Sequence, residues 1–197
     1  MLNNFYHFFQ ANGKISMEEM ESLKSLYHRE EVKKGDFLLR EGGHCHHTFF
    51  VESGLIRMYA IDGQGKEHIV QFACENWLLS DRSSAYFDES SDYFIDAIED
   101  SVVVMLDKGF VDGIIEVNPS FQRINERLLH NHIRHLQKRI HGLMAETAEE
   151  RYLEFINLYP DLTLRVPQWM MASYLGVTPE SLSRVRRDLA KRNFKSY

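Results

Sequence analysis

The spacing of hydrophobic residues divides the chain into a β-rich part and a helical part. After a short stretch with helical spacing at residues 17–27, apolar and polar positions alternate from Val32 to Leu106, interrupted by glycine-containing turns. The clearest predicted strands are residues 48–51, 55–61, 67–72, 93–98 and 102–106. The second and third flank the glycine-rich segment 62–65, which favours an antiparallel hairpin. Short strands at this spacing predict a jelly roll or a barrel.

A long helix is predicted to follow the strands. Pro119 suits the first helical turn, Asn118 or Ser120 can cap it, and no proline interrupts the pattern until about Met144. Five apolar residues then recur at spacings of four and three, which is the a/d stripe of a heptad repeat. They are Leu129, Ile133, Leu136, Ile140 and Leu143. The stripe favours a parallel two-fold dimer, and a helix that packs on its own domain is the alternative.

The remaining segment predicts a helix-turn-helix motif. An amphipathic helix at 147–159 and a short strand at 162–166 come first. In the motif, Gly176 can adopt the positive φ of the turn, Thr178 can cap the second helix, and Pro179 can begin it. The positions expected to face inward are Met171, Ala172, Leu175, Val177, Leu182 and Val185.

The outer face of the predicted second helix carries side chains that can read DNA. Glu180 and Arg184 lie one turn apart near its N-terminal end, the end that enters a major groove. A glutamate can accept from cytosine N4, and an arginine can donate to guanine O6 and N7. A surface ion pair between residues four apart is the alternative. Predicted contacts to the DNA backbone are Thr178, Ser181, Arg186, Arg187, Lys191 and Arg192.

Charge is distributed unevenly along the chain. The net charge is −6, but residues 1–117 hold 10 Lys and Arg against 21 Asp and Glu, whereas residues 151–197 hold 8 against 4. An acidic body with a basic end is typical of a polyanion-binding module attached to a separate domain. A charged surface helix without a partner is the alternative.

Composition and motifs exclude several other classes of protein. The two cysteines, Cys45 and Cys74, are too few for a disulfide framework or a four-cysteine metal site, which indicates a reducing compartment. The first 14 residues lack the pattern of a signal peptide, and no apolar stretch approaches the roughly 20 residues that cross a bilayer. The sequence therefore predicts a cytoplasmic protein without a membrane partner. It also lacks a phosphate-binding glycine loop and a nucleophile elbow, so no enzyme activity is expected.

Two stretches resemble one known family. Residues 176–189, GVTPESLSRVRRDL, resemble the recognition segment of the catabolite-activator/FNR (Crp/Fnr) superfamily. Glu41-Gly42 and the stretch 50–59 resemble the β-roll of the same family. The resemblance covers nearly the whole chain and implies an α+β fold. Its parts are a cyclic-nucleotide-binding-like β-roll at 1–117, a dimerisation helix at 118–145 and a helix-turn-helix domain at 146–197.

The resemblance also implies a function. A homodimeric transcription regulator would bind palindromic double-stranded DNA with TGA-containing half-sites, and RNA polymerase is a candidate partner. Glu180, Ser183 and Arg184 match the family's base-reading positions. Two features depart from the family: the sequence ends at Tyr197 without the usual β-hairpin wing, and Pro179 stands where some relatives have a base-contacting arginine.

The family's ligand cassette is altered in this sequence. Cyclic-nucleotide binders of the family hold the cyclic phosphate with an Arg-Ser pair, and Ser91 and Asp92 align with that pair here. Because an aspartate repels a phosphate, cyclic AMP is not expected as a ligand, and no cofactor is predicted. Arg82 could replace the missing arginine if the alignment contains a short gap. Trp77, Arg82, Ser91 and Asp92 form the candidate effector pocket, and the effector is not identified.

A histidine-rich segment is a second candidate site in the β-roll. His44, Cys45, His46 and His47 are types of side chain that bind zinc, copper or haem iron. Successive residues of a strand point to opposite faces, so at most two of them can converge. We therefore expect a polar connection between strands and no metal. A metabolite, metal or haem sensor of the same fold with weak or no DNA binding is the alternative function.

Overall fold

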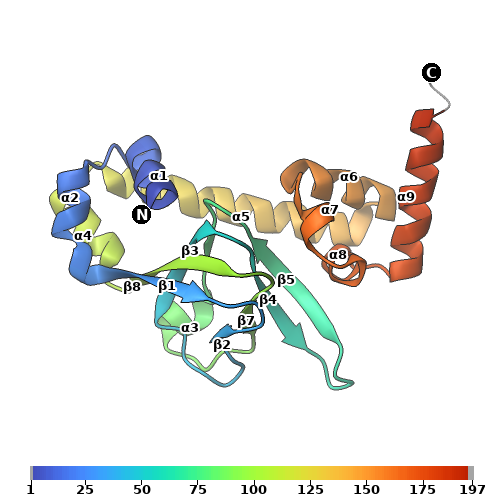
Figure 1. Ribbon diagram of the computed structural model, residues 1–197, viewed down its shortest axis with the longest axis horizontal. Helices are drawn as coiled ribbons and strands as arrows, with labels where there is room; N and C mark the ends of the chain where they lie inside the picture. Colours follow the sequence, from blue (N-terminus) through green and yellow to red (C-terminus); the bar gives the residue numbers. More distant parts are fainter. Residues whose placement is uncertain (1, 195–197) are drawn as a thin grey trace. The chain divides into compact units, whose positions relative to one another are not determined.

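The computed structural model describes residues 2–194, and the chain folds as two compact units (Figure 1). The first unit contains Met1–Lys66 and Val70–His130, and the second contains Glu67–Ile69 and Asn131–Tyr197. The boundary falls inside one long helix, α5 (Phe121–Ala145). The predicted end of the C-terminal domain, at residue 197, lies outside the described residues.

Two antiparallel sheets form the body of the first unit. The strands are β1 (Tyr27–Val32), β2 (Phe37–Leu39), β3 (His47–Ser53), β4 (Ile56–Ile61), β5 (Glu67–Ala73), β6 (Leu78–Leu79), β7 (Phe94–Ala97) and β8 (Ser101–Asp107). One sheet has the order β1-β8-β3-β6 and the other the order β2-β7-β4-β5. The arrangement confirms the predicted β-roll. It also confirms the hairpin, because β4 and β5 are neighbours joined by the turn at 62–66.

The space between the two sheets is filled with apolar side chains. Val51 and Val103 enter it from the first sheet, and Ile56 and Ile95 enter it from the second; all four are fully buried. The alternation along each strand that the sequence shows is the cause, because every second side chain of a strand faces the opposite sheet.

Helices cover the outer face of the first sheet and form a second core. They are α1 (Asn3–Gly13), α2 (Met17–Ser22), the 3₁₀ turn η1 (Lys24–Leu26) and α4 (Phe110–Val117). The rings of Phe5 and Phe50 are 5.4 Å apart, and so are those of Phe9 and Phe110. The sequence did not predict α1 or α4. It also extended the helix at 17–27 too far, because Tyr27 already pairs in β1.

A buried carboxylate fixes α1 to the sheet. Glu52 on β3 accepts the backbone N–H groups of Asn4 at 2.9 Å and Phe5 at 2.8 Å. The first N–H groups of a helix have no partner within the helix, and a negative charge there also interacts favourably with the helix dipole. Glu52 therefore satisfies the first turn of α1 from a distant part of the chain.

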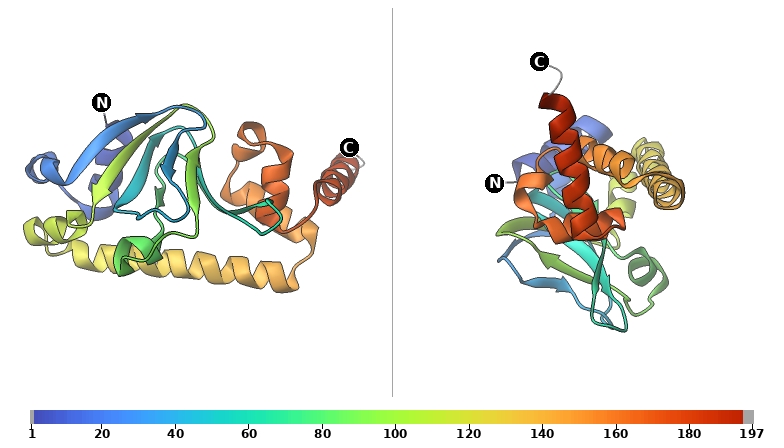
Figure 2. Two further views of the ribbon diagram at one scale, coloured as in Figure 1. Left: turned by 90° about the horizontal axis from the view of Figure 1, so that it is seen from below. Right: turned by 90° about the vertical axis from the view of Figure 1, so that its right-hand side faces the viewer.

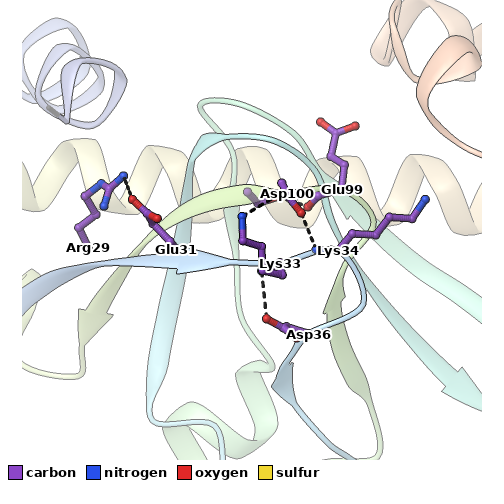
Figure 3. Close-up of polar contacts among 8 residues, drawn as sticks. Arg29, Glu31, Lys33, Lys34, Asp36, Glu99 and Asp100 are labelled. Carbon is purple, nitrogen blue, oxygen red and sulfur yellow. Dashed lines mark hydrogen bonds and ion pairs between the residues drawn. The ribbon is translucent and has the colours of Figure 1, made fainter.

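An ion pair joins the two places where the chain crosses between the sheets (Figure 3). Lys33 lies in the β1–β2 connection, and its Nζ is 2.9 Å from Oδ2 of Asp100 in the β7–β8 connection. The backbone N–H of Lys34 donates to the same carboxylate at 3.0 Å. These contacts hold the pKa of Asp100 below its usual value. Both side chains are exposed, so the pair contributes little to stability and mainly orders the two turns.

Helices make up most of the second unit, which also includes the first three residues of β5. After α5 come α6 (Ala148–Leu158), α7 (Leu162–Arg165), α8 (Gln168–Leu175) and α9 (Pro179–Phe194). One more short helix, α3 (Arg82–Phe87), belongs to the first unit. Thr147 and Glu150 form a capping box at the start of α6. The strand predicted at 162–166 is wrong. Leu162 and Val166 are both buried and Leu164 is 90% exposed, which is the pattern of one helical turn.

Within the described residues, none of the helices is both long enough and apolar enough to span a bilayer.

Candidate nucleic-acid interface

The turn between α8 and α9 has the predicted geometry. Gly176 adopts a φ of 64°, a left-handed conformation that favours glycine. The backbone N–H of Val177 then donates to the Ala172 carbonyl at 3.0 Å. Thr178 Oγ1 accepts the N–H of Ser181 at 3.2 Å and so caps α9, which begins at Pro179. These contacts set the direction in which α9 leaves the turn.

The inner faces of the two helices pack together as expected. Leu182 of α9 is buried, as are Met171, Ala172 and Leu175 of α8, while Val185 is half-buried. Below them, three rings form one aromatic cluster with centroid separations of 5.3 to 6.0 Å. They belong to Phe155, Tyr159 and Tyr174. One side of α9 is therefore fixed against a rigid platform, and its opposite side is free.

Two arginines hold the carboxyl end of α8. Arg139 of α5 donates from Nη2 to the Tyr174 carbonyl at 3.2 Å, and its guanidinium lies 4.2 Å from the centre of the Tyr174 ring. Arg151 of α6 donates from Nη1 to the Leu175 carbonyl at 2.6 Å. Cations at the carboxyl end of a helix interact favourably with its dipole. The sequence analysis did not assign a role to either arginine, because both contacts join segments far apart in the chain.

The predicted base-reading residues lie together on the exposed face of α9. Glu180, Ser183 and Arg184 line one surface hollow with Arg187. Gln168 of α8 lines the same hollow, and its Nε2 donates to the Pro179 carbonyl at 3.0 Å. Sequence analysis missed Gln168. Its position at the start of the first helix of the motif was the one feature of the sequence that could have indicated a place beside α9.

Ion pairs within the described residues neutralise the charge of neither Glu180 nor Arg184, whereas Arg187 Nε lies 3.8 Å from Oδ1 of Asp188. The surface ion pair between Glu180 and Arg184, which was the alternative to base reading, is therefore not present among residues 2–194. The Glu180 backbone N–H and the Thr178 hydroxyl hold the pKa of the Glu180 carboxyl below its usual value. At neutral pH the side chain is thus only a hydrogen-bond acceptor, while Arg184 is only a donor.

The residues predicted to contact the DNA backbone differ in their surroundings. Arg187 and Lys191 are exposed, and Arg186 is half-buried. Arg192 already pairs with Glu149 of α6. The remaining two predicted contacts, Thr178 and Ser181, are bonded to each other in the cap.

The predicted dimer helix has an exposed apolar face. Ile133 and Ile140 are 49% and 57% exposed, and Leu136 is exposed on the same stripe. Leu143 is exposed as well. Its side chain also lies against the turn, because a Cβ added at Gly176 would be only 2.8 Å from Cδ2 of Leu143. Leu129 is half-buried and belongs to the first unit. Apolar side chains exposed in a row on a helix are typical of an interface.

The structure places the four candidate effector residues in different surroundings. Trp77 packs against the core between the sheets, and Asp92 is exposed. Ser91 is buried, and its hydroxyl bonds with the backbone of Tyr93. Arg82 is exposed at the start of α3.

The histidine-rich segment is extended and alternates as expected. His44 and His46 are exposed with their rings stacked, whereas Cys45 is buried on the opposite side. His47 Nε2 lies 3.2 Å from Oδ1 of Asp107. Within the part of the chain that the structure describes, no three His, Cys, Asp or Glu side chains are grouped so that they could hold a metal ion.

Known proteins identify the family. Residues 29–118 match the family model of the cyclic nucleotide-binding domain. The transcriptional activator protein Anr of Pseudomonas aeruginosa is 30% identical over 183 residues, which are 87% of this chain and 74% of that protein. The chain belongs to the Crp/Fnr family. The fumarate and nitrate reduction regulatory protein of Vibrio cholerae is 26% identical over 87% of this chain and 72% of its own length.

Solved structures agree with this Crp/Fnr assignment at the level of the fold. The structure of FixK2 from Bradyrhizobium japonicum superposes with a TM-score of 0.71 at 20% identity, covering 85% of this chain and 86% of that one. Members of the Crp/Fnr family bind DNA and act as dimers. This Crp/Fnr protein is a DNA-binding transcription regulator with a cyclic-nucleotide-binding-like domain.

Proposed function

We propose that this Crp/Fnr regulator reads DNA bases with Glu180, Ser183 and Arg184. The carrying observation is that Glu180 and Arg184 are exposed and unpaired on a helix whose other side is buried. In a major groove, Arg184 would donate to guanine O6 and N7, and Glu180 would accept from cytosine N4. Ser183, on the same face, would add a hydrogen bond to either base.

Phosphate contacts would orient the helix without reading sequence. Arg187 and Lys191 are the best placed, because both are exposed and lie further along α9. Arg192 would have to exchange Glu149 for a phosphate. Arg186 and Ser181 are only half-exposed, and the Thr178 hydroxyl is already bonded to Ser181 in the cap. Gln168 joins this set, since its carboxamide lies in the same hollow as Arg184.

The proposal also covers dimerisation and the roles of the three parts of the chain. The exposed stripe of α5 pairs two copies, and a two-fold dimer requires a palindromic operator. Residues 1–117 act as the sensor, 118–145 as the dimer helix and 146–197 as the DNA-binding domain. The protein acts in the cytoplasm, has no catalytic activity, does not use cyclic AMP, and contacts RNA polymerase at its promoters.

Selection of binding sites from random DNA, followed by titration of the selected duplex, tests base reading. Arg184→Ala should lose about 1–3 kcal/mol on the selected site and almost nothing on unrelated DNA. Arg40→Ala, which removes an exposed arginine of the β-roll, is the matched control. Equal binding of the selected site by wild type and Arg184→Ala would contradict the proposal.

A second variant tests the role of Glu180. Glu180→Gln replaces an acceptor with a side chain that both accepts and donates, so the selected half-site should change at one position, from cytosine towards adenine. An unchanged half-site would remove Glu180 from the base-reading set.

A further inference from the structure

Among the described residues that line the hollow on α9, Pro179 is the only one with an apolar side chain. Pro179 is exposed and is the first residue of α9, which Figure 2 shows in red as it continues from the short turn after α8. The proposed base contacts use Glu180, Ser183 and Arg184. They leave the proline ring without a role.

The helix places Pro179 beside the residues that are proposed to read bases. Pro179 and Ser183 are four residues apart and therefore lie on the same side of α9, one turn from each other. Glu180 and Arg184, also four apart, form the neighbouring row, and all four residues line the one hollow. A helix that brings these side chains to base edges in a major groove therefore brings the proline ring to the same edges.

The proline ring is held in one orientation. The ring fixes its own backbone φ near the helical value, and at the first position of a helix the missing N–H costs little because that group has no partner within the helix. The Pro179 carbonyl accepts a hydrogen bond from Gln168 Nε2 at 3.0 Å, which ties the first turn of α9 to α8. Thr178 caps the same turn by accepting the N–H of Ser181. A side chain that is already rigid loses little conformational entropy when it is placed against DNA.

The chemistry of the proline ring limits what it can recognise in a major groove. The ring has no hydrogen-bond donor or acceptor, so it cannot bond to the nitrogen and oxygen atoms of a base edge. The 5-methyl group of thymine is the apolar group that the bases present there. Contact between the ring and this methyl group is favourable because it removes apolar surface of both partners from water. A polar base edge in the same place would be desolvated without gaining a bond.

We propose that Pro179 selects a thymine next to the base pairs contacted by Glu180 and Arg184, through the 5-methyl group of that base. The inference rests on the proposed reading of bases by α9 and adds a further specificity-determining residue to it. Each half-site is thereby read at one more base pair.

Replacement of thymine by uracil in the DNA tests the contact, because the two bases differ only by the methyl group. The probes are duplexes of the site that the wild-type protein selects, with the same thymine of both half-sites replaced by 2′-deoxyuridine, one position at a time. At the position next to the base pairs read by Glu180 and Arg184, the dissociation constant of the wild type should rise about tenfold, because one methyl contact is lost in each half-site. Uracil tolerated at every thymine, or a selected half-site without a thymine at that position, would overturn the proposal.

Two variants assign the methyl effect to Pro179. Pro179→Ser removes the apolar ring, so it should bind the thymine and the uracil duplexes with the same affinity. Pro160→Ser, which changes an exposed proline outside the hollow, should keep the full difference between the two duplexes. The Pro179 side chain is exposed, so its replacement should not unfold the protein, and the melting temperature checks this. An unchanged preference for thymine in Pro179→Ser would refute the proposal.

Arg184→Ala, measured on the same duplexes, separates this inference from the proposed function. If Arg184→Ala binds the selected site like the wild type, base reading by α9 is wrong and the role of Pro179 is wrong with it. If Arg184→Ala loses the selected site while the wild type tolerates uracil at every thymine, only the role of Pro179 is wrong.

Discussion

Two exposed helical faces of this regulator are built in opposite ways. On α5 the exposed stripe is apolar, with Ile133 and Ile140 about half-exposed. On α9 the exposed face is polar, with Glu180 and Arg184 unpaired. Water solvates the α9 face at little cost, whereas the α5 stripe keeps apolar surface in contact with water and is stabilised by association.

The difference shows how each face can be interpreted. Exposed apolar surface indicates an interface by itself, because its burial is favourable with almost any complementary apolar surface. Exposed polar surface is common, so the α9 face is informative only through its chemistry and its support. An acid and a guanidinium one turn apart, on a helix fixed by Leu182, supply the acceptor and the donor that the proposed base contacts require.

The largest expected effect comes from placing a charge on the apolar face. Ile140→Arg removes an isoleucine from each protomer and brings two positive charges together, which should weaken the dimer by about 3–6 kcal/mol. Sedimentation velocity should show a monomer at micromolar concentration, and binding to a palindromic site should fall at least about a hundredfold. His141→Arg, exposed but off the stripe, is the control. A dimer that survives Ile140→Arg would place the interface elsewhere.

The next effect concerns the support of the polar face. Leu182 is buried between α9 and α8, so Leu182→Ala should destabilise the helix-turn-helix by about 2–5 kcal/mol. Thermal unfolding followed by circular dichroism measures the loss. Arg184→Ala is the contrast, because it should remove specific DNA binding with almost no change in melting temperature. Similar melting temperatures for Leu182→Ala and wild type would mean that α9 does not depend on this platform.

A smaller effect should appear in the salt dependence of binding. Arg187→Gln removes one proposed phosphate contact per protomer, so the slope of log K against log salt concentration should fall by about 1.8 for the dimer. Affinity should drop alike for cognate and unrelated DNA, unlike the effect of Arg184→Ala. An unchanged slope would mean that Arg187 does not neutralise a phosphate.

The smallest expected effect is a pH dependence of stability. Burial is the main cause that holds the pKa of His47 below its usual value, and burial and then Arg139 do the same for His135. The unfolded chain therefore takes up protons first as the pH falls through about 6.5, and this contribution to stability is present above that pH and lost below it. Chemical denaturation at pH 7.5 and 5.5 should show a loss, and the double variant with glutamine at both positions should lose less. An equal loss in both proteins would contradict the assignment.

Local determinants explain which parts of the fold the sequence predicts. Gly176, Thr178 and Pro179 define the turn within a few residues of each other, and the structure has the predicted turn, cap and helix start. The hairpin of the β-roll is equally local. The strand predicted at 162–166 was wrong because Leu162 and Val166, four residues apart, share one face of a helical turn, while Leu164 between them is exposed.

Long-range contacts explain what the sequence does not predict. Phe9 is part of the second core only because Phe110 and Phe121, more than a hundred residues further along the chain, pack beside it. Gln168 shares a hollow with Arg184 because the turn brings the two helices together. No periodicity of a single segment encodes such pairs, so the sequence alone predicts neither contact.

The bond between Glu52 and the first turn of α1 has a practical consequence for laboratory work. A shortened protein that begins after residue 15 would keep the whole β-roll, yet it would leave a buried carboxylate without its two amide donors. Such a deletion would remove only a terminal segment, yet it should lower the free energy of unfolding as a substitution in the core does. A shortened protein made to study the β-roll alone should therefore keep the residues of α1.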